Sequence, residues 1–293
     1  MRKLFLAVLC LTLSAVAATA DEKCTLVRNA SLDVQIDAAG GMDVPIVVSG
    51  RPLMLLVDTG AVFSMLNQSV VDTLGLKLEY IPEAGLVLYG GTRITSYVTA
   101  YDVQLGKMKG PKADFLVMPN GHLPPGTDGI LAPDFLSRFD ADFDFANAKL
   151  NFFSHDHCDG RVVYWTHDAI AVVPFDMDEV RHIMFHVQLD SKDVKAIFDT
   201  GSSRSVMSLE AAEDLFGFDD ATAKKYNGRY PFKELTLDGV TLNNPDVLLV
   251  PDDVSKVMRR APPLILGMGV LRQLHLYIAY REHKLYITAA SAH

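Results

Sequence analysis

Short apolar and alternating runs, separated by Gly, Pro, Asn and Asp, recur along the chain and predict a protein built mainly from β-strands. In the first half, residues 51–57 form a nearly continuous apolar run, as expected of a strand buried on both faces. Alternating residues around Gly40-Gly41 and Gly90-Gly91 predict two hairpins, and residues 142–153 predict a third. Residues 68–74, followed by Gly75, predict a short helix.

The second half repeats this order of elements. Residues 169–175, 183–189 and 194–198 predict strands, and residues 209–216 predict a helix with Ser208 as its N-cap. The dipeptide Asn227-Gly228 is typical of a hairpin turn. His182 and His186 alternate with apolar residues in one of these strands, which predicts that they face solvent.

One tripeptide occurs in both halves, each time at the end of an apolar run. Asp58-Thr59-Gly60 follows residues 53–57, and Asp199-Thr200-Gly201 follows residues 194–198. An ionised carboxylate at the end of a buried strand is costly unless something uses or neutralises it. Two such sites suggest two aspartates that meet across an internal twofold and share one proton. A single such tripeptide would be interpreted as an ordinary turn aspartate.

A second pair of motifs follows the first pair at similar spacing. Gly129-Ile130-Leu131-Ala132 and Leu264-Ile265-Leu266-Gly267 each predict a short apolar strand that ends at a small residue and leads into a helix. The long spacing between the copies indicates a duplicated domain, not a repeat array. With these four motifs the chain resembles the aspartic proteases, specifically retropepsin-like ones in which two lobes are fused in one chain.

The resemblance implies a mostly β, two-lobed fold of the pepsin and retropepsin type, with the active-site cleft between the lobes. Asp58 and Asp199 would then be the catalytic pair that activates water for peptide hydrolysis, without a covalent intermediate, a metal or another cofactor. Thr59 and Thr200 would form a hydrogen-bonded bridge between the loops. The expected partner is a peptide or protein substrate, and a chain with both copies would be complete as a monomer.

Gly60 and Gly201 would let backbone amides approach the carboxylates. The two loops differ at the next position, because Ser202 can hydrogen-bond a carboxylate and Ala61 cannot. We therefore expect Asp199 to be the more acidic member and Asp58 to carry the shared proton. Ala132 stands where the family usually has Gly, and its methyl group and preference against positive φ put catalytic efficiency in question.

A substrate-binding flap is expected at Tyr89, Gly90 and Gly91, because this segment is similar to the flap tip of pepsin-like enzymes. The alternative is a surface hairpin with a packed tyrosine. Residues 226–229 of the second half are the candidate counterpart, and the sequence leaves open whether one hairpin or both act as flaps.

The first twenty residues differ from the rest of the chain. Arg2 and Lys3 precede an apolar stretch that ends at Ala18-Thr19-Ala20, which predicts a secretory signal peptide over residues 1–20. An uncleaved anchor is the alternative. The mature chain is then expected to have no membrane span and to be exported, either to the periplasm or to the medium, with lobes over residues 21–160 and 161–293.

Two cysteines remain beyond the leader, Cys24 and Cys158. In an oxidising compartment they are expected to form a disulfide, and two free thiols are the alternative. Cys158 lies in residues 155–159, a sequence His-Asp-His-Cys-Asp that also resembles a metal-ligand cluster, although its spacing matches no closed zinc site. We interpret it as a polar linker and expect no metal.

The net charge of −9 and the lack of a basic stripe argue against a nucleic-acid partner. Two functional classes remain: an aspartic endopeptidase, and a catalytically impaired relative that binds peptides in its cleft. A glycosidase with a carboxylate pair is disfavoured, because sugar hydrolysis does not require two matched Asp-Thr-Gly turns.

Overall fold

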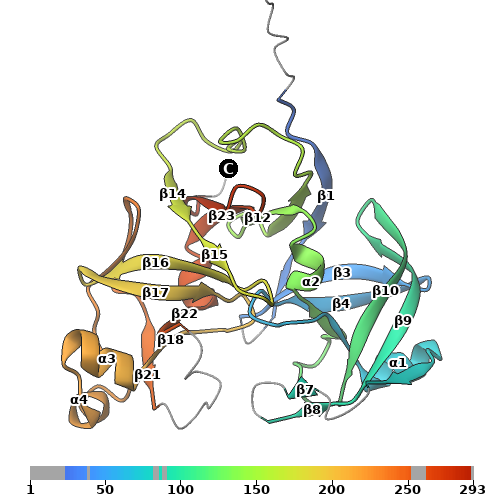
Figure 1. Ribbon diagram of the computed structural model, residues 1–293, viewed down its shortest axis with the longest axis horizontal. Coiled ribbons are helices and arrows are strands. Elements are labelled where there is room, and N and C mark those ends of the chain that lie inside the picture. Colours follow the sequence, from blue (N-terminus) through green and yellow to red (C-terminus); the bar gives the residue numbers. More distant parts are fainter. Residues whose placement is uncertain (1–23, 38–39, 82–85, 88–90, 252–261, 292–293) are drawn as a thin grey trace, which may run out of the picture.

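The computed structural model describes residues 24–37, 40–81, 86–87, 91–251 and 262–291. Two β lobes lie side by side, and a third sheet joins them (Figure 1). The predicted mostly β, two-lobed architecture is therefore confirmed. The predicted signal peptide falls outside the described residues.

The first lobe, on the right in Figure 1, is an eight-stranded sheet. Along the sheet the strands are β2 (Gln35–Ile36), β3 (Met42–Val48), β4 (Arg51–Val57), β11 (Gly129–Leu131), β5 (Met65–Asn67), β10 (Met108–Met118), β9 (Ser96–Leu105) and β6 (Leu78–Tyr80). Helix α1 (Gln68–Leu74) follows β5, and α2 (Pro133–Leu136) follows β11. β4 and β11 are parallel neighbours, with Val57 beside Leu131, so the two apolar runs of the sequence are the central strands.

The second lobe repeats this arrangement. Along its main path the strands are β20 (Val240–Asn243), β19 (Glu234–Leu237), β16 (Ile183–Leu189), β17 (Lys192–Phe198), β22 (Leu264–Leu266), β18 (Ser205–Ser208) and β21 (Val247–Val250), and β15 (Asp176–Met177) pairs with β16. Its helices are α3 (Leu209–Phe216), α4 (Asp220–Lys225) and α5 (Met268–Leu271). β17 and β22 run parallel, with Phe198 beside Leu266, which matches the pair β4 and β11.

A six-stranded sheet joins the lobes. Its order is β1 (Arg28–Asp33), β13 (Lys149–Phe153), β12 (Asp140–Asp144), β23 (Leu274–Ala279), β24 (Lys284–Ala289) and β14 (Ala171–Pro174). The two halves of the chain meet where β12 pairs with β23. Because both halves contribute to one sheet, the lobe boundary at residue 160 stays a prediction. The small hairpin of β7 (Leu86–Val87) and β8 (Arg93–Ile94) projects from the first lobe (Figure 1).

The apolar core continues between the lobes. Phe143 of the joining sheet packs edge-on against Phe198, the last residue of β17, with ring centroids 5.7 Å apart. Both side chains are fully buried. The strand that delivers Asp199 is therefore held against the joining sheet, which restrains the position of the second active-site loop.

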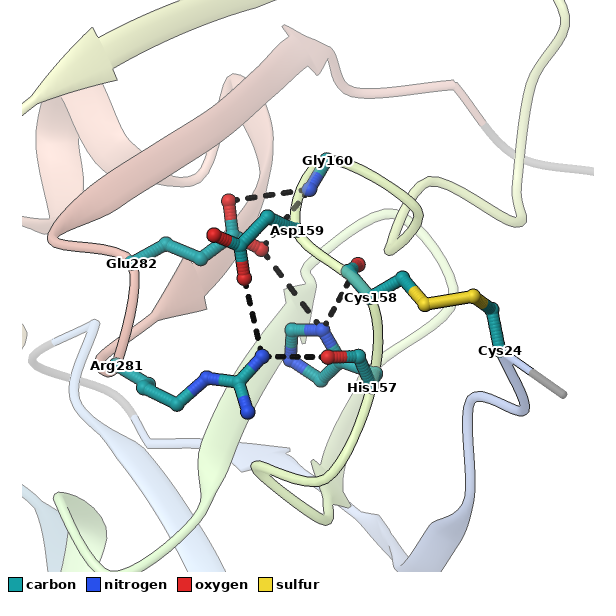
Figure 2. The surroundings of a disulfide bond; sticks show 7 residues. All are labelled: Cys24, His157, Cys158, Asp159, Gly160, Arg281 and Glu282. Atoms are coloured by element: carbon teal, nitrogen blue, oxygen red, sulfur yellow. Dashed lines mark hydrogen bonds and ion pairs between the residues drawn. A yellow bond between two sulfur atoms is a disulfide. The ribbon is translucent and has the colours of Figure 1, made fainter. Parts of the chain in front are cut away.

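A disulfide links Cys24 to Cys158, with Cα atoms 5.2 Å apart (Figure 2). It ties the beginning of the described chain to the segment between the lobes and confirms the predicted pairing. The neighbouring residues hold this segment too: His157 Nε2 lies 2.5 Å from Asp140 Oδ2, and Glu282 accepts a hydrogen bond from the Gly160 amide. Arg281 donates to the carbonyl of His157.

In residues 155–159, which resemble a metal-ligand cluster, the side chains of His157 and Cys158 have partners within the protein. Cys158 is bonded to Cys24, and the ring of His157 contacts Asp140. Across the part of the chain that the structure describes, no three His, Cys, Asp or Glu side chains are grouped so as to hold a metal ion.

Several local predictions are confirmed. The helix at residues 68–74 ends at Gly75, which adopts a left-handed conformation, and the Ser208 hydroxyl accepts a hydrogen bond from the Ala211 amide at the start of α3. The hairpin predicted at Asn227-Gly228 is wrong. These residues form the turn that follows helix α4, where the Gly228 amide donates to the carbonyl of Ala223. Both a hairpin turn and a helix end need positive φ, which explains the error.

No helix among the described residues combines the length and apolar character needed to cross a membrane.

Candidate active site

The two aspartates leave the ends of matching strands. The Asp58 amide donates to the carbonyl of Leu131, and the Asp199 amide donates to that of Leu266, both at 3.0 Å. Each aspartate thus continues the parallel pairing of its central strands by one residue. This explains why a buried apolar run precedes each of them: the run fixes the backbone from which the carboxylate projects.

The two loops bring Asp58 and Asp199 into direct contact. Each carboxylate lies against the glycine of the other loop: a Cβ placed on Gly60 would be 2.5 Å from Asp199 Cγ, and one on Gly201 would be closer still to Asp58 Cγ. Neither glycine has positive φ. Glycine is required here because any side chain would collide with a carboxylate.

Backbone amides bind both carboxylates in the same way. Asp58 Oδ1 accepts hydrogen bonds from the amides of Gly60 and Ala61, at 3.0 and 2.9 Å. Asp199 Oδ1 accepts them from Gly201 and Ser202, at 2.9 and 3.2 Å. Both aspartates keep part of their surface exposed. The arrangement holds one oxygen of each carboxylate and leaves the other available for chemistry.

The threonines link the two loops reciprocally. The Thr59 amide donates to Thr200 Oγ1 at 3.2 Å, and the Thr200 amide donates to Thr59 Oγ1 at 3.0 Å. Each hydroxyl in turn donates across the interface, Thr59 to the carbonyl of Phe198 and Thr200 to that of Val57. Both threonines are buried. This is the bridge that the sequence resemblance implies.

Burial raises the pKa of both carboxyls. Burial first, and the charge of Asp199 second, raises the pKa of Asp58 to about 7. Burial also raises the pKa of Asp199, while the amides of Gly201 and Ser202, the hydrogen bond from Asp58 and the charge of His182 oppose that rise. The two carboxyls therefore share one proton and titrate as a unit.

The reason given from the sequence for expecting Asp199 to be the more acidic member is wrong. Ser202 Oγ donates to the carbonyl of Arg204 at 2.7 Å and does not bind Asp199. The amide of Ser202 binds Asp199 much as that of Ala61 binds Asp58, so the residues after the two glycines treat the carboxylates alike.

Ala132 fits its position without strain, which corrects the concern about positive φ. Its φ is −110°, close to the −101° of Gly267 in the second lobe. The amide of each donates to a serine hydroxyl, Ser64 and Ser205 respectively. Gly267 cannot carry a side chain because the carbonyl of Arg204 lies against it, whereas Ala132 packs in a small apolar cluster with Met65 and others.

The predicted flap lies partly outside the described residues. Strands β7 and β8 pair on either side of it, and Gly91, shortly before β8, has a φ of +85°. Tyr89 and Gly90 are outside the described residues. In the second lobe, residues 226–229 form the turn that follows helix α4 and not a second flap hairpin.

One residue at the site was missed. His182 was expected to face solvent, but its ring lies between the lobes, where Nε2 is 2.9 Å from the carbonyl oxygen of Gly60. His186, by contrast, is exposed as expected and contacts Asp193. The turns that precede β3 and β16 begin with Asp37 and Asp178. Alignment of these two turns in the sequence would have placed His182 opposite Gly41 and marked it as a residue that differs between the halves.

The turn that carries His182 also borders a cavity. Glu179, Val180 and Arg181 line one side of a space of about 530 Å³, and Val62, Phe63 and Arg138 of the first lobe are among the residues on the other side. Neither aspartate lines this cavity. Val62, Phe63 and Ser64, which follow the Asp58 loop in the sequence, line this cavity.

Comparison with known proteins points to one family. A family model described as aspartyl protease matches residues 44–135 and 185–270, which is more than half of the chain and both copies of the repeat. A comparison with curated protein sequences gave no significant match.

Solved structures with the same overall fold include basic 7S globulin from soybean, with a TM-score of 0.57 and 12% identity over 90% of this chain and 95% of that chain. Conglutin gamma, a basic 7S globulin from lupine seeds, gives a TM-score of 0.55 and 12% identity over 89% of this chain and 95% of its own. The protein edgp gives a TM-score of 0.58 and 11% identity, with coverage of 89% and 94%. At such identities the likeness concerns the fold alone.

Proposed function

Because the chain belongs to the aspartyl protease family, we propose that it is an aspartic endopeptidase in which Asp58 and Asp199 activate water against a peptide bond. The observation that carries the proposal is the direct contact between the two carboxyl groups, each of which lies against the glycine of the other loop. Burial raises the pKa of both, so the pair holds one proton at mild pH. Such a pair offers an acid and a base at the same point.

The reaction follows from the positions of the protons. Ionised Asp199 takes a proton from a water molecule, whose oxygen attacks the carbonyl carbon of the substrate. Protonated Asp58 gives its proton to the carbonyl oxygen. The tetrahedral intermediate then collapses: Asp199 gives its proton to the nitrogen of the leaving peptide, Asp58 takes a proton back from a hydroxyl of the intermediate, and the C–N bond breaks. Water is the only co-reactant, and no covalent bond to the protein forms.

The surroundings support this division of roles. Burial and the charge of Asp199 favour the protonated form of Asp58, while the charge of His182 favours the ionised form of Asp199. The threonine bridge restrains the two loops relative to each other, so the carboxyl groups keep their separation while a substrate binds.

The expected substrate is an extended peptide segment. Both aspartates come from one chain, so we expect the monomer to be catalytically complete. We further propose that the protein works outside the cytoplasm, since the disulfide between Cys24 and Cys158 is stable in an oxidising compartment. Whether that compartment is the periplasm or the medium is decided by fractionation of the producing cells.

The test is digestion of a diverse peptide library between pH 4 and 7, with the cut positions mapped by mass spectrometry. Wild type, Asp58→Asn and Asp199→Asn are compared, and Asp176→Asn serves as the matched control, because Asp176 is exposed on β15. We expect cuts with wild type and the control and none with the dyad variants. If folded wild type and the dyad variants all leave the library uncut, the result would contradict the proposal and favour a peptide-binding relative.

A further inference from the structure

Two turns at corresponding positions of the lobes are closed by the same hydrogen bonds but end in different side chains. In the first lobe the Asp37 amide donates to the carbonyl of Gly41, and in the second the Asp178 amide donates to that of His182. Oδ1 of each aspartate accepts from the amide four residues later, at 2.7 and 2.9 Å. His182 therefore stands where the first lobe has Gly41, so the internal symmetry is broken at this residue.

The ring of His182 has an acceptor at each nitrogen. Nδ1 lies 2.9 Å from Asp178 Oδ2, and Nε2 lies 2.9 Å from the carbonyl oxygen of Gly60. A carbonyl oxygen cannot donate a hydrogen bond, and neither can an ionised carboxylate. A neutral imidazole has one N–H, so it would leave one of these contacts as two facing lone pairs. The imidazolium donates to both, which makes it the form that fits.

The contact reaches the dyad through Gly60. The carbonyl of Gly60 belongs to the first-lobe loop, and the Cα of Gly60 lies against the carboxylate of Asp199 in the second lobe. The ring of His182 thus joins a second-lobe turn to the first-lobe loop beside Asp199. A positive charge at this position lowers the pKa of Asp199. No corresponding charge acts on Asp58, because Gly41 has no side chain.

We propose that His182 is a positioning residue of the dyad: its imidazolium anchors the Gly60 carbonyl and places a positive charge beside Asp199, so that the shared proton rests on Asp58. The inference rests on the proposed function, and it deepens it by assigning which aspartate is the base. The alternative source of asymmetry, the hydroxyl of Ser202, is directed to Arg204. Backbone amides bind the two carboxylates alike and supply no asymmetry.

The charged groups around His182 are consistent with a cationic ring. Asp178 faces it from its own turn, and the dyad faces it from beyond Gly60. Of the neighbours in the turn, the charge of Arg181 opposes the burial-induced rise in the pKa of Tyr280, and Glu179 lines the cavity. Across that cavity, the charged side chains are Asp114, Asp134 and Arg138. The ring itself is only 17% exposed, so solvent screens its charge weakly.

The experiment measures kcat/KM against pH for a peptide that wild type cleaves. His182→Gln keeps a donor for the Gly60 carbonyl but removes the charge. Asp178→Asn keeps an oxygen for the turn amides but removes the partner of the imidazolium. The matched control is His186→Gln, because His186 also contacts an aspartate, at 2.7 Å, but stands on the exposed face of β16, the strand that His182 precedes.

We expect the acidic limb of the profile to move upward by about 1 pH unit in His182→Gln, because the pKa of Asp199 rises when a neighbouring positive charge is lost. Asp178→Asn should move it in the same direction, and His186→Gln should not move it. A merely structural role of His182 would lower kcat/KM equally at every pH. An unmoved limb in His182→Gln, or an equal shift in His186→Gln, would overturn the proposal.

A readout without catalysis separates this inference from the proposed function. In wild type labelled with ¹⁵N-histidine, both ring N–H groups of His182 should be detected at pH 5 and exchange with water more slowly than those of exposed His186. Exchange as fast as that of His186 would overturn the inference. Absence of peptide cleavage by wild type would contradict only the proposed function and would leave this measurement valid.

Discussion

Replacement of Thr200 by valine removes one hydroxyl from the bridge between the active-site loops and leaves the side-chain volume nearly unchanged. The hydroxyl donates to the carbonyl of Val57 at 2.6 Å and accepts from the amide of Thr59 at 3.2 Å. Val57 and Thr59 are buried, so both backbone groups would lose their partner away from water. At about 1–3 kcal/mol for each unsatisfied group, Thr200→Val should lower the free energy of unfolding by roughly 2–6 kcal/mol.

Urea unfolding is the assay, followed by the fluorescence of Trp165, the single tryptophan of the chain. Its ring stacks on His275 with centroids 4.3 Å apart, so it reports on the joining sheet. The matched control is Thr241→Val on an exposed strand position, which should change stability by less than about 0.5 kcal/mol. A loss below about 1 kcal/mol in Thr200→Val, with an unchanged m-value, would refute the reasoning.

Three further predictions follow from the same site. Gly201→Ala should abolish peptide cleavage without unfolding the protein, because its Cβ would collide with the Asp58 carboxylate. The control Gly269→Ala should keep cleavage, because its Cβ would lie 3.7 Å from the nearest atom. An active Gly201→Ala would contradict the geometry. Asp58→Asn should be more stable than wild type at pH 7, by up to roughly 4 kcal/mol, and similar at pH 4. The sign follows because a pKa raised to about 7 makes wild type lose stability as pH rises from about 4 to 7, and equal thermal stability at pH 7 would argue against it. In the double variant Cys24→Ser/Cys158→Ser the free energy of unfolding should fall by roughly 2–5 kcal/mol, and the variant should still cut peptides at low temperature. A loss of cleavage in the folded variant would show that the disulfide shapes the site.

The duplicated motifs made the fold and the aspartate pair predictable. Each Asp-Thr-Gly follows an apolar run that becomes a central strand, and the residues 129–132 and 264–267 become its parallel neighbour and the start of a helix. Such short elements are fixed by local composition, so their bounds could be predicted as well: α1 and α3 begin and end as expected.

The features that could not be predicted depend on partners far away in the sequence, or on which of two nearby acceptors a side chain binds. His182 alternates with Ile183 and Phe185 as a surface residue would, but its ring binds a carbonyl 122 residues away in sequence. Ser202 had two acceptors within reach, and it donates to the carbonyl two residues on. The joining sheet pairs strands from both halves of the chain, such as β12 with β23, and no local pattern specifies that register.

The most direct test of the central claim is the pH dependence of kcat/KM of wild type for one cleaved peptide. The claim is that Asp58 and Asp199 share a single proton and that water is activated only in that state. The account predicts a bell-shaped profile that falls on the acidic side as Asp199 gains a proton and on the basic side near pH 7 as Asp58 loses its own. A rate that stays constant or continues to rise well above pH 7 would contradict it.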